Sequence, residues 1–146
     1  MTERFIMKDT DPAAFKAMLG LESYLSSTGI SPLHHELIRV RASQLNGCAY
    51  CINIHTQDAR KLGETEQRLY LLNAWRESPQ FSDEERIILA ITEEVTFISQ
   101  QGLTADTYDK AVQHFGVKGT AEIIMAVNVI NAWNRIGISS HRVPGK

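Results

Sequence analysis

Signals that begin and end helices recur along the whole chain, and they restrict its fold more than any other feature of the sequence. Ser31 followed by Pro32 is typical of a helix start, as is Ser82 with Glu85 three residues later. Between such signals, apolar residues repeat at spacings of three and four, which is the helical period. No stretch shows a convincing alternation of apolar and polar residues, the pattern of a half-buried strand. The sequence therefore predicts an all-α fold.

About seven helices are expected from these signals, over residues 12–28, 31–46, 48–62, 65–78, 82–101, 104–116 and 120–136. The last of them is apolar on most sides, so we expect it to be the central helix of the fold. The segment that follows it, residues 137–146, is expected to form a loose tail.

Size and composition indicate one domain over residues 1–146, because 43% apolar and 22% charged residues are ordinary for a globular protein. The chain has 15 lysines and arginines against 17 aspartates and glutamates, and this net charge of −2 gives no general basis for binding nucleic acid or acidic membranes. The longest apolar runs, such as residues 123–127, are far shorter than the roughly 20 residues of a membrane-spanning helix. The N-terminal apolar stretch is also too short for a secretory signal, so a cytoplasmic protein is expected.

Both cysteines of the chain lie in one tetrapeptide, Cys48-Ala49-Tyr50-Cys51. In a protein without an export signal, such a pair favours redox or metal chemistry over structural crosslinking. If a helix begins here, Cys48, Cys51 and His55 share one of its faces, because positions i, i+3 and i+7 lie close at ~3.6 residues per turn. The spacing therefore predicts that two thiols and an imidazole converge.

A thiol needs a proton acceptor to become a nucleophile, since an unperturbed cysteine with a pKa of about 8.5 is mostly protonated at pH 7. A helix N-terminus stabilises an anion by roughly 0.3–1 kcal/mol, which is less than one pKa unit. The local candidate for the base is His55, one turn from Cys51. A carboxylate would orient that histidine, and Glu36 could supply it if the reversal at Asn46-Gly47 folds two helices together.

Two structural alternatives to redox chemistry stay open at this point. The cysteines could be buried thiols that act as small apolar groups. They could also bind zinc, with ligands drawn from Cys48, Cys51, His55 and Glu36. No second Cys-x-x-Cys or paired histidine motif accompanies them, so we expect no metal and no cofactor.

Glu36, eleven intervening residues and Cys48-x-x-Cys51-x-x-x-His55 resemble the core motif of the AhpD-like alkyl hydroperoxidase group, within the carboxymuconolactone decarboxylase superfamily. Flanking segments agree with it, at residues 41–47, 58–60, 63–65 and 131–135. The similarity extends over roughly residues 31–135. It implies an all-α fold and a homo-oligomer, commonly a trimer or a hexamer.

The resemblance also implies a thiol peroxidase that reduces hydrogen or alkyl hydroperoxides. Cys51 would attack the peroxide and become a sulfenic acid, Cys48 would resolve it to a disulfide, and Glu36 with His55 would relay protons. An external dithiol, which could be lipoyl, thioredoxin-like or a small thiol, would then reduce the pair. A redox-responsive or structural oligomer, or a general thiol-disulfide oxidoreductase with little peroxidase turnover, is the alternative.

One position departs from the family pattern. The best-known AhpD peroxidases carry a histidine immediately before the second cysteine, where this chain has Tyr50. A tyrosine can donate a hydrogen bond to a peroxide oxygen, but it cannot act as a base near neutral pH. His35, which adjoins Glu36, is a second auxiliary candidate because it could reach the site.

Overall fold

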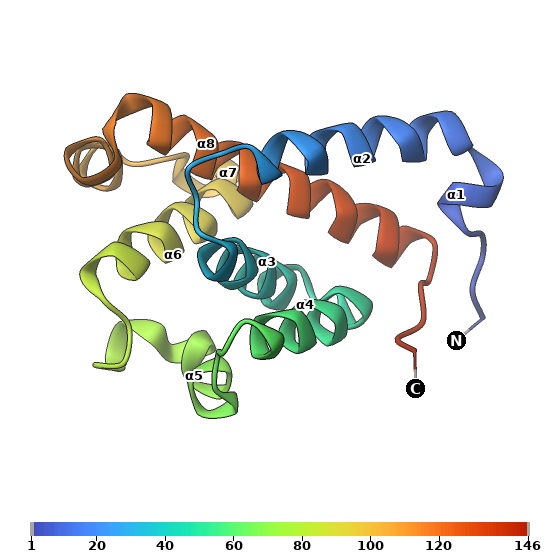
Figure 1. The fold of residues 1–146 in the computed structure, drawn as a ribbon, viewed down its shortest axis with the longest axis horizontal. Helices are drawn as coiled ribbons and strands as arrows, with labels where there is room; N and C mark the ends of the chain where they lie inside the picture. The colour runs from blue at the N-terminus through green and yellow to red at the C-terminus, as the bar shows by residue number, and fades with distance from the viewer. Residues whose placement is uncertain (1, 146) are drawn as a thin grey trace.

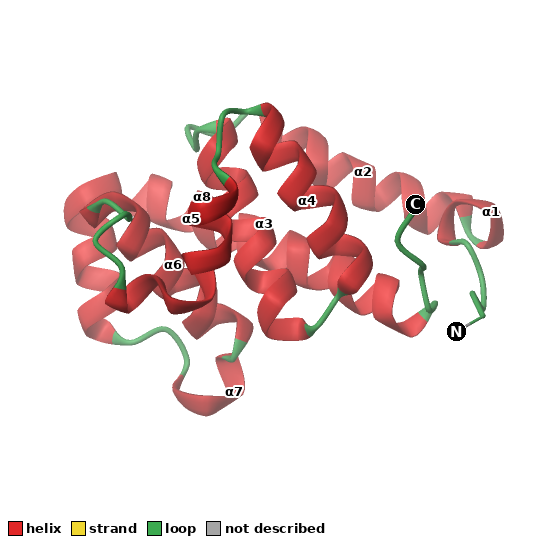
Figure 2. Cartoon of the chain, turned by 90° about the horizontal axis from the view of Figure 1, so that it is seen from below, coloured by secondary structure: helices red, strands yellow, loops and turns green. Residues whose placement is uncertain are grey.

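The computed structural model describes residues 2–145, and every regular element in that range is a helix (Figures 1 and 2). The expected all-α fold is therefore confirmed. In chain order the elements are α1 (Met7–Thr10), α2 (Pro12–Ser26), α3 (Pro32–Asn46), α4 (Ala49–Lys61), α5 (Glu66–Leu71), the 3₁₀ helix η1 (Leu72–Glu77), α6 (Asp83–Thr96), α7 (Ile98–Gln101) and α8 (Ala105–Ser139).

The predicted helix starts are present with their caps. The Ser31 hydroxyl accepts the backbone N–H of His34 at 3.1 Å, and Ser82 and Glu85 form a reciprocal capping box. At the other end of α3, Gly47 has a φ of 71°, a conformation that glycine adopts without steric cost. This residue lets the chain reverse directly from α3 into α4, and the two helices pack together.

Several boundaries differ from the expected ones. The chain contains α1, which carries no strong sequence signal, and the helix expected over residues 65–78 tightens into η1, where Ala74 is non-helical. The helix expected over residues 82–101 is interrupted at Phe97 and divides into α6 and α7. The last two expected helices lie within one element, α8, but Gly116 between them is non-helical, with a φ of 72° and a ψ of 171°. The helix end expected at residue 116 is therefore present as a kink that divides α8.

The expectation of a loose tail from residue 137 onward is wrong for its first part. Helix α8 continues to Ser139, and the Arg4 backbone N–H donates to the Ser140 carbonyl at 2.9 Å. The Arg142 N–H donates to the carbonyl of Gly137 at 2.9 Å. The first bond joins the N-terminal segment to the end of α8, and the second folds residue 142 back onto α8, so the C-terminal segment is part of the packed structure.

Helix α3 lies between α4, α6 and α8, and two apolar clusters meet on it. The first joins α3 to α6 and α8 through Ile38, Ile88, Ile91, Ile123, Val127 and Ile130. The second joins α3 to α4, α5, η1 and α6 through Leu37, Val40, Ala59, Leu69, Leu72 and Leu89. Each such side chain contributes about 1.5–3 kcal/mol by leaving water. Because α3 is covered on several sides, some of its polar side chains are also buried, and Glu36 is only 5% exposed.

One end of the molecule is packed less densely. Figure 1 shows α1, α2, the C-terminal end of α8 and both chain termini gathered there. On α2 only Leu25 is buried, whereas Leu19 is 47% exposed. This end leaves room for a cavity over the start of α4. Among the helices of residues 2–145, none is long and apolar enough to cross a membrane.

Candidate active site

The two cysteines stand at the beginning of α4. Cys48 is the N-cap, and its sulfur accepts the backbone N–H of Cys51 at 3.3 Å. The sulfurs are joined in a disulfide, with 5.3 Å between the two Cα atoms. Both residues are buried, at 2% and 5% exposure. The two sulfurs therefore converge as the spacing predicts, as a bonded pair at a helix N-terminus, where a thiolate is favoured over one in water.

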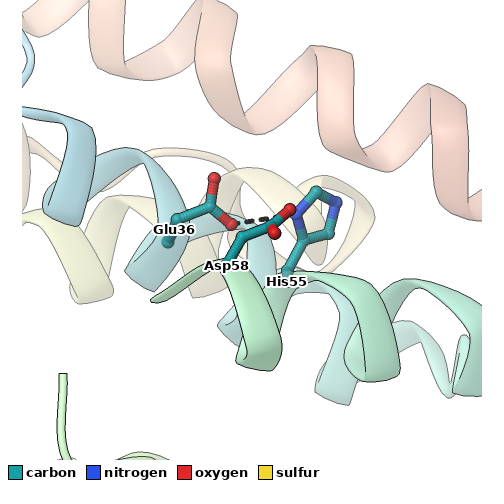
Figure 3. A group of neighbouring side chains, drawn as sticks. All are labelled: Glu36, His55 and Asp58. Atoms are coloured by element: carbon teal, nitrogen blue, oxygen red, sulfur yellow. Dashed lines mark hydrogen bonds and ion pairs between the residues drawn. The ribbon is translucent and has the colours of Figure 1, made fainter. Parts of the chain in front are cut away.

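Helices α3 and α4 bring Glu36 and His55 together. The His55 Nδ1 atom lies 2.9 Å from the Glu36 Oε2 atom, as the dashed line in Figure 3 shows. With the proton on Nδ1, the imidazole donates to the carboxylate and leaves Nε2 free to accept a proton. Glu36 therefore orients His55 as the sequence predicts, because the reversal at Gly47 places the two helices side by side.

The second oxygen of the Glu36 carboxylate is also occupied. Its Oε1 atom accepts a hydrogen bond from Arg39 Nη1 at 2.5 Å, and Arg39 Nη2 donates to Glu22 Oε2 at 2.7 Å. The Trp133 indole N–H then donates to Glu22 Oε1 at 2.8 Å. An unpaired charge would be costly in this partly buried position, and these bonds pair each of the charges.

A cavity of about 340 Å³ opens beside the disulfide. Cys51 and His55 line it, whereas Cys48 is not among its lining residues. Most of its wall is apolar and comes from α1, α2, α4 and α8, with side chains from Ile6, Met7, Phe15, Leu19, Ile54, Trp133 and Ile136. Cys51 is thus the cysteine that faces a space large enough for an organic molecule.

Tyr50 lines the same cavity and lies against the C-terminal segment. The Arg142 guanidinium carbon is 5.1 Å from the centre of the Tyr50 ring. Contacts with Tyr50 and with the Glu3 carboxylate raise the pKa of Arg142 above its usual value. Sequence reasoning missed Arg142, because an isolated arginine after the last helix carries no local signal of the residues it will meet.

His35 does not reach the cysteines. Its Nε2 atom lies 3.2 Å from the Thr28 hydroxyl, which itself donates to the Leu25 carbonyl, so His35 is the donor. Burial, assisted by the positive charge of Arg39, lowers the pKa of His35 below 6.5. His35 is also absent from the lining of the cavity, so the structure separates this auxiliary candidate from the site.

Gly137 of α8 approaches the disulfide closely. A Cβ atom at this position would lie 3.3 Å from the Cys48 sulfur and 3.6 Å from the Cys51 sulfur. Any larger side chain would press on the sulfurs. A glycine inside a predicted helix usually signals either a helix end or a close approach, and here it is the second.

Glu36, His55 and Asp58 form the group of side chains that most resembles a metal site (Figure 3). Zinc bonds of about 2.0–2.2 Å would hold tetrahedral ligand atoms roughly 3.3 Å apart. The 2.9 Å between His55 and Glu36 is instead a hydrogen-bond distance, and Asp58 is paired with Lys61 at 2.7 Å. In this arrangement Glu36, His55 and Asp58 are each engaged by another side chain of the protein.

Comparison with known proteins agrees with the geometry. Residues 12–94 match the profile of the carboxymuconolactone decarboxylase family. The uncharacterized protein YdfG of Bacillus subtilis is 39% identical over 139 residues, which are 95% of each chain. A solved structure from Agrobacterium tumefaciens, described as a putative antioxidant defence protein AhpD, is 34% identical and covers 99% of both chains with a TM-score of 0.95.

A more distant structure shares the fold alone. The debrominase Bmp8 is 17% identical, with a TM-score of 0.82 over 94% of this chain and 74% of that one. The resemblance to the AhpD-like group is thus confirmed by sequence and by structure. The protein belongs to the carboxymuconolactone decarboxylase family.

Proposed function

We propose that the protein is a thiol-dependent peroxidase that reduces organic hydroperoxides or hydrogen peroxide with the Cys48 and Cys51 pair. One observation carries this proposal. Cys51 and His55 line the same cavity, and the buried Glu36 carboxylate holds the imidazole in the orientation that a base requires.

The first step begins from the reduced pair. The Cys51 thiol gives its proton to His55 Nε2, and the thiolate attacks the terminal oxygen of the hydroperoxide. An S–O bond forms while the O–O bond breaks, and the departing alkoxide takes the proton from the imidazolium. The products are an alcohol, or water from hydrogen peroxide, and a sulfenic acid on Cys51.

The second step uses Cys48. Its sulfur attacks the Cys51 sulfenic acid, so that an S–S bond forms and the S–O bond breaks. The departing hydroxide takes the proton that the Cys48 thiol gives up, and leaves as water. An external dithiol then supplies two electrons by thiol exchange. Because Cys51 faces the cavity and Cys48 caps α4, the reductant attacks Cys51 and displaces Cys48, whose thiolate the helix N-terminus stabilises.

The proposed enzyme is also a homo-oligomer. Between α6, α7 and α8 the surface carries a hollow lined by apolar side chains, including Ile98, which is 58% exposed, and by the polar residues Asn128, Asn131 and Arg135. Apolar surface of this kind favours contact with another protein chain. Sedimentation equilibrium would detect a trimer or a hexamer, whereas a monomer at all concentrations would exclude both.

The test of the peroxidase is the consumption of cumene hydroperoxide with dithiothreitol, measured for the wild type, Cys48→Ser and Cys51→Ser. We expect both variants to lose turnover. A dimedone-type probe should label a sulfenic acid in Cys48→Ser, where Cys51 remains, and not in Cys51→Ser. Equal labelling of both variants would contradict the assignment of Cys51 as the attacking residue. A wild type that forms its disulfide with no peroxide consumption would favour a redox-responsive protein or a general oxidoreductase.

A further inference from the structure

Glu22 places a carboxylate in the wall of the cavity, and two donors from different helices fix its position. It lies on α2, accepts one hydrogen bond from the Trp133 indole on α8 at 2.8 Å, and accepts another from Arg39 on α3 at 2.7 Å. The Glu22 and Arg39 side chains are 28% and 20% exposed. The motif that connects the cysteines, His55 and Glu36 assigns no role to either residue.

We propose that Glu22 and Arg39 are positioning residues for His55: they hold Glu36 in place and set the charge around the imidazole, so that these four side chains together carry no net charge once His55 has accepted a proton. This inference rests on the proposed function, and it adds two residues to the proton relay. The bonds form one continuous chain from the cavity wall at Glu22, through Arg39 and Glu36, to the imidazole.

The charge balance of these four side chains supports the inference. With a neutral imidazole, Glu22, Arg39 and Glu36 together carry a charge of −1, which becomes zero when His55 accepts a proton. Without Glu22 the other three side chains would carry a charge of +1 after the same protonation, in a half-buried position where charges interact more strongly than in water. A thiolate formed on Cys51 in the proposed first step is a separate charge and is not part of this sum. A single carboxylate paired with an arginine would therefore be a weaker partner for the imidazolium than two carboxylates that share the arginine.

Other charged groups also face this region. Asp58 lies one turn beyond His55 on α4, and its carboxylate is paired with Lys61 at the surface. The cavity wall carries the cations Lys8 and Arg142, and Arg142 is paired with Glu3. His35, the nearest other titratable group on α3, is held neutral by its burial and by Arg39. Lys8 is exposed, so water screens its charge, and the other groups are paired or neutral. The charge next to His55 is therefore set by the shared arginine and its two carboxylates.

An arginine suits this position for a geometric reason. Its planar guanidinium has separate Nη1 and Nη2 donors, and here each one binds a different carboxylate. A lysine carries one compact ammonium group, which is a poorer match for two carboxylates that approach from different helices. Arg39 thus fixes the distance between Glu22 in the cavity wall and Glu36 beside His55. It also supplies the positive charge between these two carboxylates.

The test compares two variants that remove opposite charges from the same chain of bonds. In the oxidised protein, the His55 titration midpoint is measured by NMR for the wild type, Glu22→Gln and Arg39→Gln. Removal of the carboxylate should lower the proton affinity of His55 by about threefold or more, and removal of the guanidinium should raise it by a similar factor. Glu66→Gln, which neutralises an exposed carboxylate on α5, is the matched control and should leave the midpoint unchanged.

Opposite shifts cannot come from a merely structural role, because disruption of the packing would move both variants in the same direction. Shifts of the same sign, or no shift in either variant, would overturn the proposal. If one variant does not fold, the sign of the shift in the other still decides the outcome. The NMR titration needs no peroxide, so its result is independent of whether the protein turns over hydroperoxides.

Discussion

The site combines two regions that differ in packing. In the α3–α4 region, Glu36 is 5% exposed and its two oxygens are bound by His55 and Arg39 at 2.9 and 2.5 Å. In the wall formed by α1, α2 and the end of α8, side chains such as Leu19 remain 47% exposed and most contacts are apolar. The first region has the fixed geometry that proton transfer requires, and the second has the adaptable surface that binding an apolar molecule requires. Reactivity and substrate preference should therefore respond to different substitutions.

The largest effect is expected in the α3–α4 region. Glu36→Gln keeps the shape of the side chain but removes the charge that stabilises the imidazolium. Loss of such support for a general base typically costs about 100-fold or more, so kcat with cumene hydroperoxide should fall by that factor while KM changes little. Steady-state kinetics from pH 6 to 9 would measure it, and turnover unaffected across this range would contradict the relay.

A smaller effect of another kind is expected in the wall. The Phe15 ring contacts the Trp133 ring edge to face, with 5.8 Å between their centres. Phe15→Ala removes apolar contact area, so kcat/KM for cumene hydroperoxide should fall about tenfold, mostly through KM. The kcat/KM for hydrogen peroxide should stay the same, because this substrate has no apolar group to contact the cavity wall. Tyr70→Ala, on the exposed surface of α5, is the control, and equal losses for both peroxides would remove the distinction between the two regions.

Gly137 lies where the two regions meet, and its substitution should act on the redox balance. The added Cβ of Gly137→Ala would lie 3.3 Å from the Cys48 sulfur, which crowds the pair. Reduction separates the sulfurs to non-bonded contact and needs more room, so the equilibrium with a dithiothreitol redox buffer should shift about threefold or more toward the disulfide. Gly20→Ala on α2, where nothing lies within 4 Å, is the control and should leave the equilibrium unchanged. A shift toward the dithiol would show that the added methyl group does not act by crowding.

The smallest effect concerns stability and pH in the α3–α4 region. The folded protein holds the pKa of His35 below 6.5 through burial and the nearby Arg39 charge. The unfolded chain therefore takes up this proton first as the pH falls, and the free energy of unfolding decreases below about pH 6.5. Urea unfolding at pH 7.5 and 5.0 would measure the decrease. It should be smaller in His35→Gln, and an identical decrease in the variant would exclude His35 as its source.

The same two regions differ in how far the sequence predicts them. Ser31, Gly47 and the cysteine spacing are local signals, and together they predict α3, the reversal, the start of α4 and the meeting of Glu36 with His55. The wall depends on contacts between residues that are far apart in the chain. Arg142, for example, reaches Tyr50 and Glu3 only because both termini fold back to the same end of the molecule.

The helix boundaries that were not predicted have a similar cause. The apolar period continues through Phe97, but the chain leaves the helical conformation there. Local propensity gives a weak preference at such positions, and packing against the rest of the fold overrides it. His35 illustrates the limit within a correctly predicted helix, since its neighbour Glu36 enters the site while His35 itself binds Thr28.

The proposed peroxidase activity requires the reduced cysteine pair to react with a hydroperoxide faster than ordinary thiols do. The most direct measurement mixes reduced protein with one equivalent of cumene hydroperoxide and follows the Cys48–Cys51 disulfide by rapid quenching and mass spectrometry. We predict one disulfide for each peroxide consumed, at a rate about 100-fold or more above that of dithiothreitol at the same pH, since a positioned base contributes that much. A rate equal to that of dithiothreitol, or peroxide loss without formation of the disulfide, would contradict the account.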